Sequence, residues 1–324
     1  MKHLKITSPQ YTFLLQNFKQ WLDTIGYAER TINSLPIHVQ ELLHHLEQKN
    51  ITQIAQIKQR HITDFSNYIK SRTNKKSGAG LSSSSINKTL QAVKTFIRYI
   101  NQTSNHSLDA SPKRVVSEIN ERTILTKAEI KKLHEASYEP GKHNSAAIGQ
   151  RDRAMIAILY GCGLRRNEAS RLNLSDIDLI KQRLFVKRGK GGKQRYVPIA
   201  TKNAEDIRSY LEEGRNWFLE HHYSSTCYKH IVKKENTDDE AFFLNHQGKR
   251  VKDFCYRIKI LGDKAGIDKD FSPHSLRHSI ATHLLQSGMK IEDIARFLGH
   301  SSLESTQIYT HIVNQINQKE DEHR

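Results

Sequence analysis

The stretch QRLFVKRGKGGKQRYVPIA, residues 182–200, interrupts a pattern that is otherwise helical in the second half of the chain. Two short runs of apolar residues flank a turn rich in Gly and Lys, which is typical of a β-hairpin. On both sides of it the apolar residues return to helical spacing. We therefore predict a mainly α-helical fold with a small β-sheet.

The turn of this hairpin places Lys190 between glycines, whose backbone freedom lets a lysine reach into a site. The turn is not a P-loop, because the GxxxxGK spacing is absent and no Ser or Thr follows the lysine. A solvated basic turn is the alternative interpretation.

Downstream, FSPHSLRHSIATHLL (271–285) predicts a helix that Ser272 caps and Pro273 begins. His274 falls in its first turn and Arg277 one turn later, both off the apolar stripe. A helix N-terminus with such side chains can bind a phosphate, since free N–H groups and the helix dipole favour an anion. A His and an Arg that merely face water remain the alternative.

Further on, LGHSSLESTQIYTH (298–311) contains His300 after the end of one helix and predicts another helix from about Ser302. Tyr309 lies about 100° around this second helix from its apolar stripe. We therefore expect Tyr309 to lie off the core.

Upstream, YGCGLRRNEASRLNLSDID (160–178) contains Arg165, whose planar guanidinium can donate to two phosphate oxygens at once. Arg165 paired with Glu168 or Asp176 as scaffold is equally compatible with the pattern. Asp176 and Asp178 also allow the interpretation that the chain is a metal-dependent nuclease, although it has no metal-binding motif.

The first hundred residues contain four helical patterns, which predict a small helical bundle over residues 1–103. The last pattern carries Lys88, Lys94 and Arg98, on a helix that either lies on DNA or is simply solvated. A polar stretch without periodicity predicts a linker over 104–122 and a second domain over 123–324.

The 324 residues carry a net charge of +17, spread over both halves of the chain. This excess indicates a polyanionic partner, with nucleic acid as the first candidate. Three cysteines without a CxxC pair argue against a disulfide framework and fit a reducing cytoplasm. No apolar run is long enough to span a membrane, so we expect no membrane partner.

Five motifs occur in a particular order: GLRxxE (163–168), GKGxKxRxVP (189–198), SPHxLRH (272–278), LGH (298–300) and TxxYTH (306–311). Together they resemble the tyrosine recombinases, the phage-integrase family, through most of residues 124–315. The preceding bundle resembles the SAM-like core-binding domain of the simpler, Xer-like members. The resemblance implies an α+β catalytic domain after that bundle.

By this resemblance Tyr309 is the nucleophile that forms a 3′-phosphotyrosyl link and frees a 5′-hydroxyl. Arg165 and Arg277 would grip the phosphate oxygens, and Lys190 would protonate the leaving oxygen. His274 would assist proton transfer at the tyrosine, and His300 would donate to the phosphate. No metal and no cofactor is implied. Arg166 and Asn167 depart from the family pattern and leave some choice between Arg165 and Arg166.

The resemblance implies double-stranded DNA with paired recombination sites as the partner. It implies a homo-tetramer on DNA, a monomer or weak dimer when free, and a C-terminal tail that passes to a neighbouring subunit. We expect no arm-binding domain before the bundle, which disfavours the large phage-integrase architecture that binds two classes of DNA site. Of the roles that remain we favour integration or excision of a mobile element, with Xer-type dimer resolution and DNA inversion as alternatives. A type IB topoisomerase and a DNA-binding protein whose catalysis has lapsed stay open.

Overall fold

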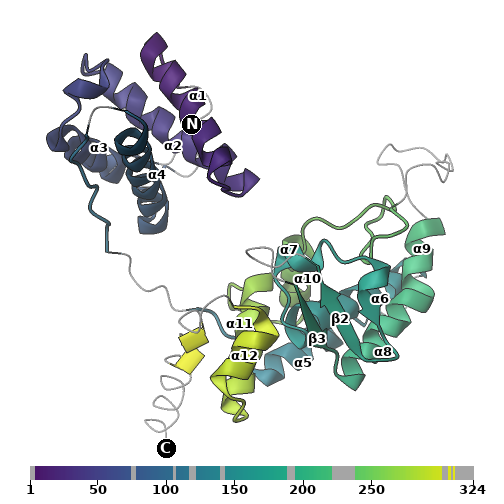
Figure 1. Ribbon diagram of the computed structural model, residues 1–324. Coiled ribbons are helices and arrows are strands. Elements are labelled where there is room, and N and C mark those ends of the chain that lie inside the picture. Colours follow the sequence, from purple (N-terminus) through teal and green to yellow (C-terminus); the bar gives the residue numbers. More distant parts are fainter. Residues whose placement is uncertain are drawn as a thin grey trace, which may run out of the picture. The chain divides into compact units, whose positions relative to one another are not determined.

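The computed structural model describes residues 4–73, 78–104, 107–116, 122–138, 143–187, 194–220, 238–300, 306–307 and 309–310. The chain folds into two compact units, residues 1–120 and 121–324, each with its own buried core (Figure 1). No helix in these residues is long and apolar enough to cross a membrane.

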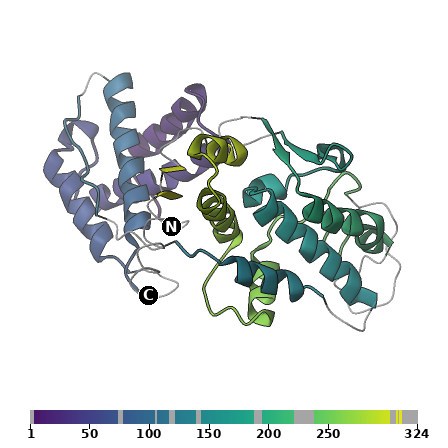
Figure 2. The same cartoon turned by 90° about the horizontal axis from the view of Figure 1, so that it is seen from below.

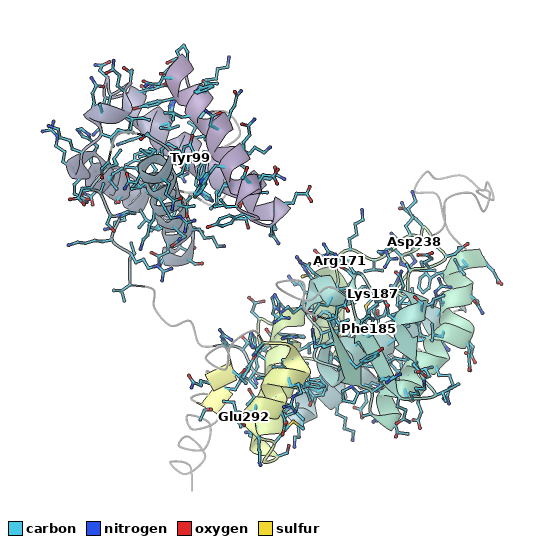
Figure 3. The ribbon with its side chains drawn as sticks, viewed as in Figure 1. Tyr99, Arg171, Phe185, Lys187, Asp238 and Glu292 are labelled. Atoms are coloured by element: carbon cyan, nitrogen blue, oxygen red, sulfur yellow. The ribbon has the colours of Figure 1, made fainter. Side chains whose placement is uncertain are left out.

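The first unit is a bundle of helices. Its elements are α1 (Pro9–Thr24), α2 (Glu29–Glu47), the short 3₁₀ helix η1 (Ile54–Gln56), α3 (Gln59–Ser71) and α4 (Ser83–Thr103). Ser82 caps α4 by accepting a hydrogen bond from the Ser85 amide. Tyr99, labelled in Figure 3, packs in the core against Phe18 and Phe96. The structure confirms the predicted helical bundle.

Residues 107–116, which fall in the predicted linker, lie against this bundle. Leu108 is 5% exposed and belongs to the bundle core. The Asn87 side chain donates to the Val115 carbonyl and accepts from the Val115 amide, both at 2.9 Å. These contacts fix the described part of the segment to the first unit.

The second unit is mainly helical. Its helices are α5 (Lys127–Glu135), α6 (His143–Ile156), the π-helix η2 (Ala157–Gly161), α7 (Arg166–Ala169), η3 (Leu174–Asp176), α8 (Thr201–Ser209), the π-helix η5 (Tyr210–Gly214), α9 (Arg215–Glu220), α10 (Cys255–Lys264), α11 (Pro273–Gln286) and α12 (Ile291–Leu298). Helix α11 packs against both η2 and α12, and Figure 2 gives the second view of this unit.

Three short antiparallel strands form the sheet, in the order β1 (Ile177–Asp178), β2 (Arg183–Val186) and β3 (Arg195–Pro198). Leu184 pairs with Val197, and both side chains are buried. Phe185 pairs with Tyr196 on the opposite face, because successive strand residues alternate between faces. The predicted hairpin and the mainly helical fold with a small sheet are confirmed.

Candidate active site

Arg165 stands at the N-cap of α7, directly after the loop that follows η2. Its guanidinium donates to Glu168 Oε1 at 2.8 Å and to the Gly299 carbonyl at 3.2 Å. The neighbouring Arg166 instead pairs with Asp253 at 3.6 Å. Of the partners left open by the sequence, the structure therefore gives Arg165 the Glu168 carboxylate.

Arg277 is 3% exposed, so the expectation that it lies off the core was wrong. Its guanidinium donates to the Gly163 carbonyl at 2.5 Å and to the Leu298 carbonyl at 2.6 Å. The periodicity of α11 alone did not reveal this burial, because its partners come from the loop after η2 and from the last residue of α12. Ser272 and Pro273 begin α11 as predicted.

Glu168 joins three arginines. Arg195 on β3 donates to its two oxygens at 3.2 and 2.9 Å, and Arg277 Nη1 lies 3.8 Å from Oε2. Burial alone would raise the pKa of Glu168, but the contacts with Arg195 and Arg165 outweigh it and lower the pKa to about 2. One carboxylate thus faces three guanidinium groups, which leaves an excess of two positive charges.

Tyr309 is 1% exposed, which contradicts the expectation that it stands off the core. It is buried with Ala281, Ile294 and Leu298 of α11 and α12. The angle from the stripe of its own helix was a poor guide, because these two other helices cover it. The predicted start of that helix near Ser302 lies outside the described residues.

The Tyr309 hydroxyl oxygen lies 2.9 Å from His278 Nδ1, within hydrogen-bond distance. The His300 ring is nearly parallel to the tyrosine ring, with centroids 6.2 Å apart. His300 Nδ1 is held 2.8 Å from the Thr306 hydroxyl. The His274 side chain is exposed and makes no hydrogen bond within the described residues, so the tyrosine hydroxyl contacts His278 rather than His274.

Burial and the surrounding positive charge lower the pKa of each of the three histidines of the site. Burial, and then repulsion from Arg122, lower the pKa of His278 to about 3. Burial, and then Arg277, lower the pKa of His300 to about 4, and the pKa of His274 shifts in the same direction. Burial raises the pKa of Tyr309 despite the opposing arginines. At neutral pH the three imidazoles and the phenol are therefore uncharged, beside the arginines.

The sequence analysis did not identify three residues of this site: Arg195, His278 and Arg122. Arg195 and His278 stand inside the quoted motifs, GKGxKxRxVP and SPHxLRH, and were the available signal. Arg122 had none, because it follows a stretch without periodicity. Its Nη1 atom lies 3.3 and 3.4 Å from the two ring nitrogens of His278.

Comparison with known proteins shows which family the chain belongs to. Residues 123–315 match the family model described as phage integrase family, and residues 15–103 match the phage integrase N-terminal SAM-like domain. The chain belongs to the phage integrase family. The arginine cluster around Glu168, which consists of Arg165, Arg195 and Arg277, lies within the first of these matches, as does Tyr309.

The curated members of the phage integrase family that resemble the chain include tyrosine recombinases of the Xer group. XerC of Oceanobacillus iheyensis is 40% identical over 51% of this chain and 50% of its own, so this match spans only about half of either protein. XerA of Thermococcus kodakarensis is 34% identical over 72% of each chain. XerC of Anoxybacillus flavithermus is 29% identical over 93% of each chain.

Solved structures that share the fold include the following two. The XerH site-specific recombinase bound to a palindromic difH substrate is 20% identical, with 98% of this chain and 89% of that chain covered and a TM-score of 0.66. The Tn1549 transposon integrase in complex with transposon right end DNA is 17% identical, with 95% and 98% covered and a TM-score of 0.64.

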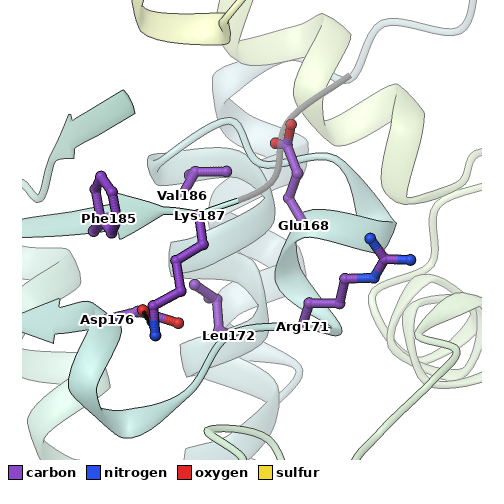
Figure 4. A pocket seen from close by; sticks show the side chains of 7 residues that line it. All are labelled: Glu168, Arg171, Leu172, Asp176, Phe185, Val186 and Lys187. Carbon is purple, nitrogen blue, oxygen red and sulfur yellow. Dashed lines mark ion pairs between the residues drawn. The ribbon is translucent and has the colours of Figure 1, made fainter. Parts of the chain in front are cut away.

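Lys190, which the resemblance to the family made the general acid, lies in 188–193, outside the described residues. The base of its hairpin is visible in Figure 4, where Lys187 Nζ lies 2.7 Å from Asp176 Oδ1 beside a pocket of about 180 Å³. Asp178 pairs with Arg183 at 3.8 Å. Both aspartates that allowed a metal-nuclease reading are thus paired with cations, and the described residues contain no cluster of three or more potential metal ligands.

The three proposed DNA-binding residues, Lys88, Lys94 and Arg98, are all exposed on α4. Arg98 donates to the Tyr27 hydroxyl at 2.9 Å, and its guanidinium lies 5.4 Å from the Trp21 ring centroid. These contacts hold the Arg98 charge in place at the surface of the first unit.

Proposed function

We propose that the protein is a site-specific recombinase that cleaves and rejoins DNA strands through a 3′-phosphotyrosyl intermediate on Tyr309. The observation that carries this proposal is the arginine cluster: three guanidinium groups share the single carboxylate of Glu168. The uncompensated charge attracts a phosphodiester, and Tyr309 is buried close enough for Arg277 and Arg165 to act on its pKa. Membership of the phage integrase family supports the same chemistry.

In the proposed reaction, Arg165 and Arg277 bind the non-bridging oxygens of the scissile phosphate. Because their carbonyl and carboxylate partners already fix them, little reorganisation is needed as charge develops on phosphorus. Donors of this kind typically stabilise a transition state by about 3–4 kcal/mol each. His300 donates to the phosphate, His274 assists proton transfer at the tyrosine, and Lys190 protonates the 5′-oxygen as it leaves. The phosphotyrosyl bond preserves the phosphodiester energy for rejoining.

We propose paired sites in double-stranded DNA as the substrate, and a homo-tetramer on that DNA. The named relatives support a recombination partner of this kind: XerH is bound to difH, and the Tn1549 integrase to a transposon end. Integration or excision of a mobile element is the role we favour, with Xer-type dimer resolution or inversion as the second candidate. The tail proposed to reach a neighbouring subunit, 311–324, lies outside the described residues.

The first experiment is recovery of covalent protein–DNA adducts from cells under denaturing conditions, followed by sequencing of the attached DNA. The wild-type chain should give adducts at a few paired sites, and Tyr309→Phe should give none while it still binds those sites. Adducts of Tyr309→Phe at the wild-type level would refute the nucleophile assignment. Wild-type adducts scattered without a shared sequence would favour a type IB topoisomerase, and sites that flank an element would support the integrase role.

A further inference from the structure

Arg122 lies just before α5, at the first described position of the second unit, and its side chain is exposed. It forms no ion pair with a carboxylate in the part of the chain that the structure describes. Its guanidinium is directed instead at the ring of His278, on α11. A cation that faces an imidazole rather than an acid is unusual, because the two groups repel once the imidazole is protonated.

The Tyr309 hydroxyl and the Arg122 guanidinium both lie close to the ring of His278. His278 Nδ1 lies 2.9 Å from the Tyr309 hydroxyl and 3.3 Å from Arg122 Nη1, slightly closer than Nε2 lies to Arg122. A guanidinium can donate but never accept, and a neutral imidazole has one acceptor nitrogen. The contacts are compatible with the tautomer in which Nδ1 carries the lone pair and accepts from the Tyr309 hydroxyl, while the ring proton sits on Nε2.

Resting on the proposed function, we propose that Arg122 is a positioning residue that holds His278 neutral with Nδ1 free, so that His278 accepts the Tyr309 proton during attack. In that step the phenol O–H bond breaks and its proton passes to His278 Nδ1. The phenol oxygen forms a bond to phosphorus while the bond from phosphorus to the 5′-oxygen breaks. Lys190 gives its proton to that oxygen, and rejoining reverses each transfer.

Several charged or titratable groups around His278 act on its pKa, and Arg122 differs from the others in the size of its effect. Arg122 is the strongest charged influence on the His278 pKa, after burial. The bound phosphate would compensate this repulsion, since its negative charge favours the imidazolium that forms in the step. The other titratable or charged groups that act on the ring are His274 and Arg277 on α11, His300 beyond α12, and Tyr309.

The free protein offers a direct test that needs no DNA. The full chain is labelled with ¹⁵N-histidine, and the signals of His278 are identified by their loss in His278→Asn. At pH 7 the wild type should show the Nε2–H tautomer, and Arg122→Gln should shift both ring signals towards a mixture of tautomers. Arg122→Lys should retain most of the wild-type pattern. An Nδ1–H wild type, or an unchanged pattern in Arg122→Gln, would overturn the proposal.

Lys127→Gln is the matched control, because it removes one exposed positive charge five residues away, at the start of α5. Lys127 acts on His283 rather than on His278. The His278 signals should therefore stay in place in this variant. A His278 shift equal to that of Arg122→Gln would mean that general charge, not the Arg122 contact, sets the tautomer, and would also overturn the proposal.

A second test follows adduct formation on a nicked duplex that carries a site recovered by adduct sequencing. In single turnover Arg122→Gln should slow the covalent step at least tenfold, within the range of general-base effects, while DNA affinity changes by less than about twofold. Arg122→Lys should recover part of the rate. Adducts formed by Arg122→Gln at the wild-type rate would contradict the positioning role of Arg122 and leave the proposed function intact. If the wild type forms no adduct, the proposed function and this proton transfer both fail, and the ¹⁵N pattern still decides the positioning role.

Discussion

Glu168 is the residue on which the charge balance of the site depends. It is 5% exposed and is the carboxylate nearest to Arg165, Arg195 and Arg277. Loss of its charge leaves buried guanidinium groups uncompensated, which typically costs about 3–5 kcal/mol. We therefore expect Glu168→Gln to lower the free energy of unfolding of the second unit by that amount, measured by urea denaturation of the full chain.

Asp293→Asn gives the matched control for this prediction. It makes the same change of acid to amide in an arginine pair, but Asp293 and Arg296 are exposed. Such surface pairs typically contribute less than about 1 kcal/mol. Equal losses in the two variants would mean that the arginine cluster does not need its buried carboxylate.

The histidines of the site predict how stability changes with pH. The folded-state pKa is about 3 for His278 and about 4 for His300, both below the ordinary value of 6.5. Between these values and 6.5 the unfolded chain binds more protons, so acid favours unfolding. Stability of the second unit should be level above pH 6.5 and fall below it, by up to about 1.4 kcal/mol per pH unit for each histidine.

Urea denaturation from pH 8 to pH 5 measures this dependence, and His278→Asn should reduce the slope. Glu168 adds nothing in this window, because its pKa of about 2 makes its contribution disappear only at lower pH. A slope that is the same in the variant and the wild type would show that His278 is protonated equally in the folded and unfolded states.

At the scale of elements, helix ends position the arginines. Gly299 ends α12 in the left-handed conformation, with φ 65°. A Cβ at this position would lie 2.7 Å from Arg195 Nη1 and 2.9 Å from Arg195 Cδ, so Arg195 would have to leave its place beside Glu168. We expect Gly299→Ala to cost more than the backbone strain of about 1–2 kcal/mol and to reduce the rate of covalent adduct formation.

Gly288, which follows α11 with φ 86°, provides the comparison because no atom lies within 4 Å of a Cβ built there. Gly288→Ala should cost only the backbone strain and leave adduct formation unchanged. The two variants are compared by urea denaturation and by single-turnover adduct yield. If both lose the same stability and keep full activity, the contact between Gly299 and Arg195 does not position the site.

Local signals in the sequence predicted the elements well. The start of α11 at Ser272 and the hairpin of β2 and β3 are both present, since each depends on residues close in sequence. Burial of Tyr309 and Arg277 was missed because it depends on other elements of the fold: α11 and α12 cover Tyr309, and Gly163 accepts a hydrogen bond from Arg277. Arg195 and His278 were in view, but only their partners in space distinguish them from other polar residues.

At the scale of the whole molecule, the charge of +17 is shared by the two units. Both units can therefore contribute to DNA affinity through phosphate contacts, and each contact releases counterions. The first unit offers Lys88, Lys94 and Arg98 along one exposed face of α4. If these residues lie on DNA, their contribution should be visible in the salt dependence of binding by the full chain.

Replacement of all three by alanine should reduce the slope of log K against log salt by about 2–3, since each phosphate contact contributes about 0.9. The measurement is a salt titration of binding to a mixed-sequence duplex, with circular dichroism to check the fold. The matched control replaces Lys19, Lys70 and Arg60, which are also two exposed lysines and one exposed arginine, on α1 and α3. Both triple variants lose the same net charge, so a general field effect changes the two slopes equally. A larger change in the α4 variant alone identifies this face as the one that contacts phosphates, because only direct contacts depend on where the charges lie.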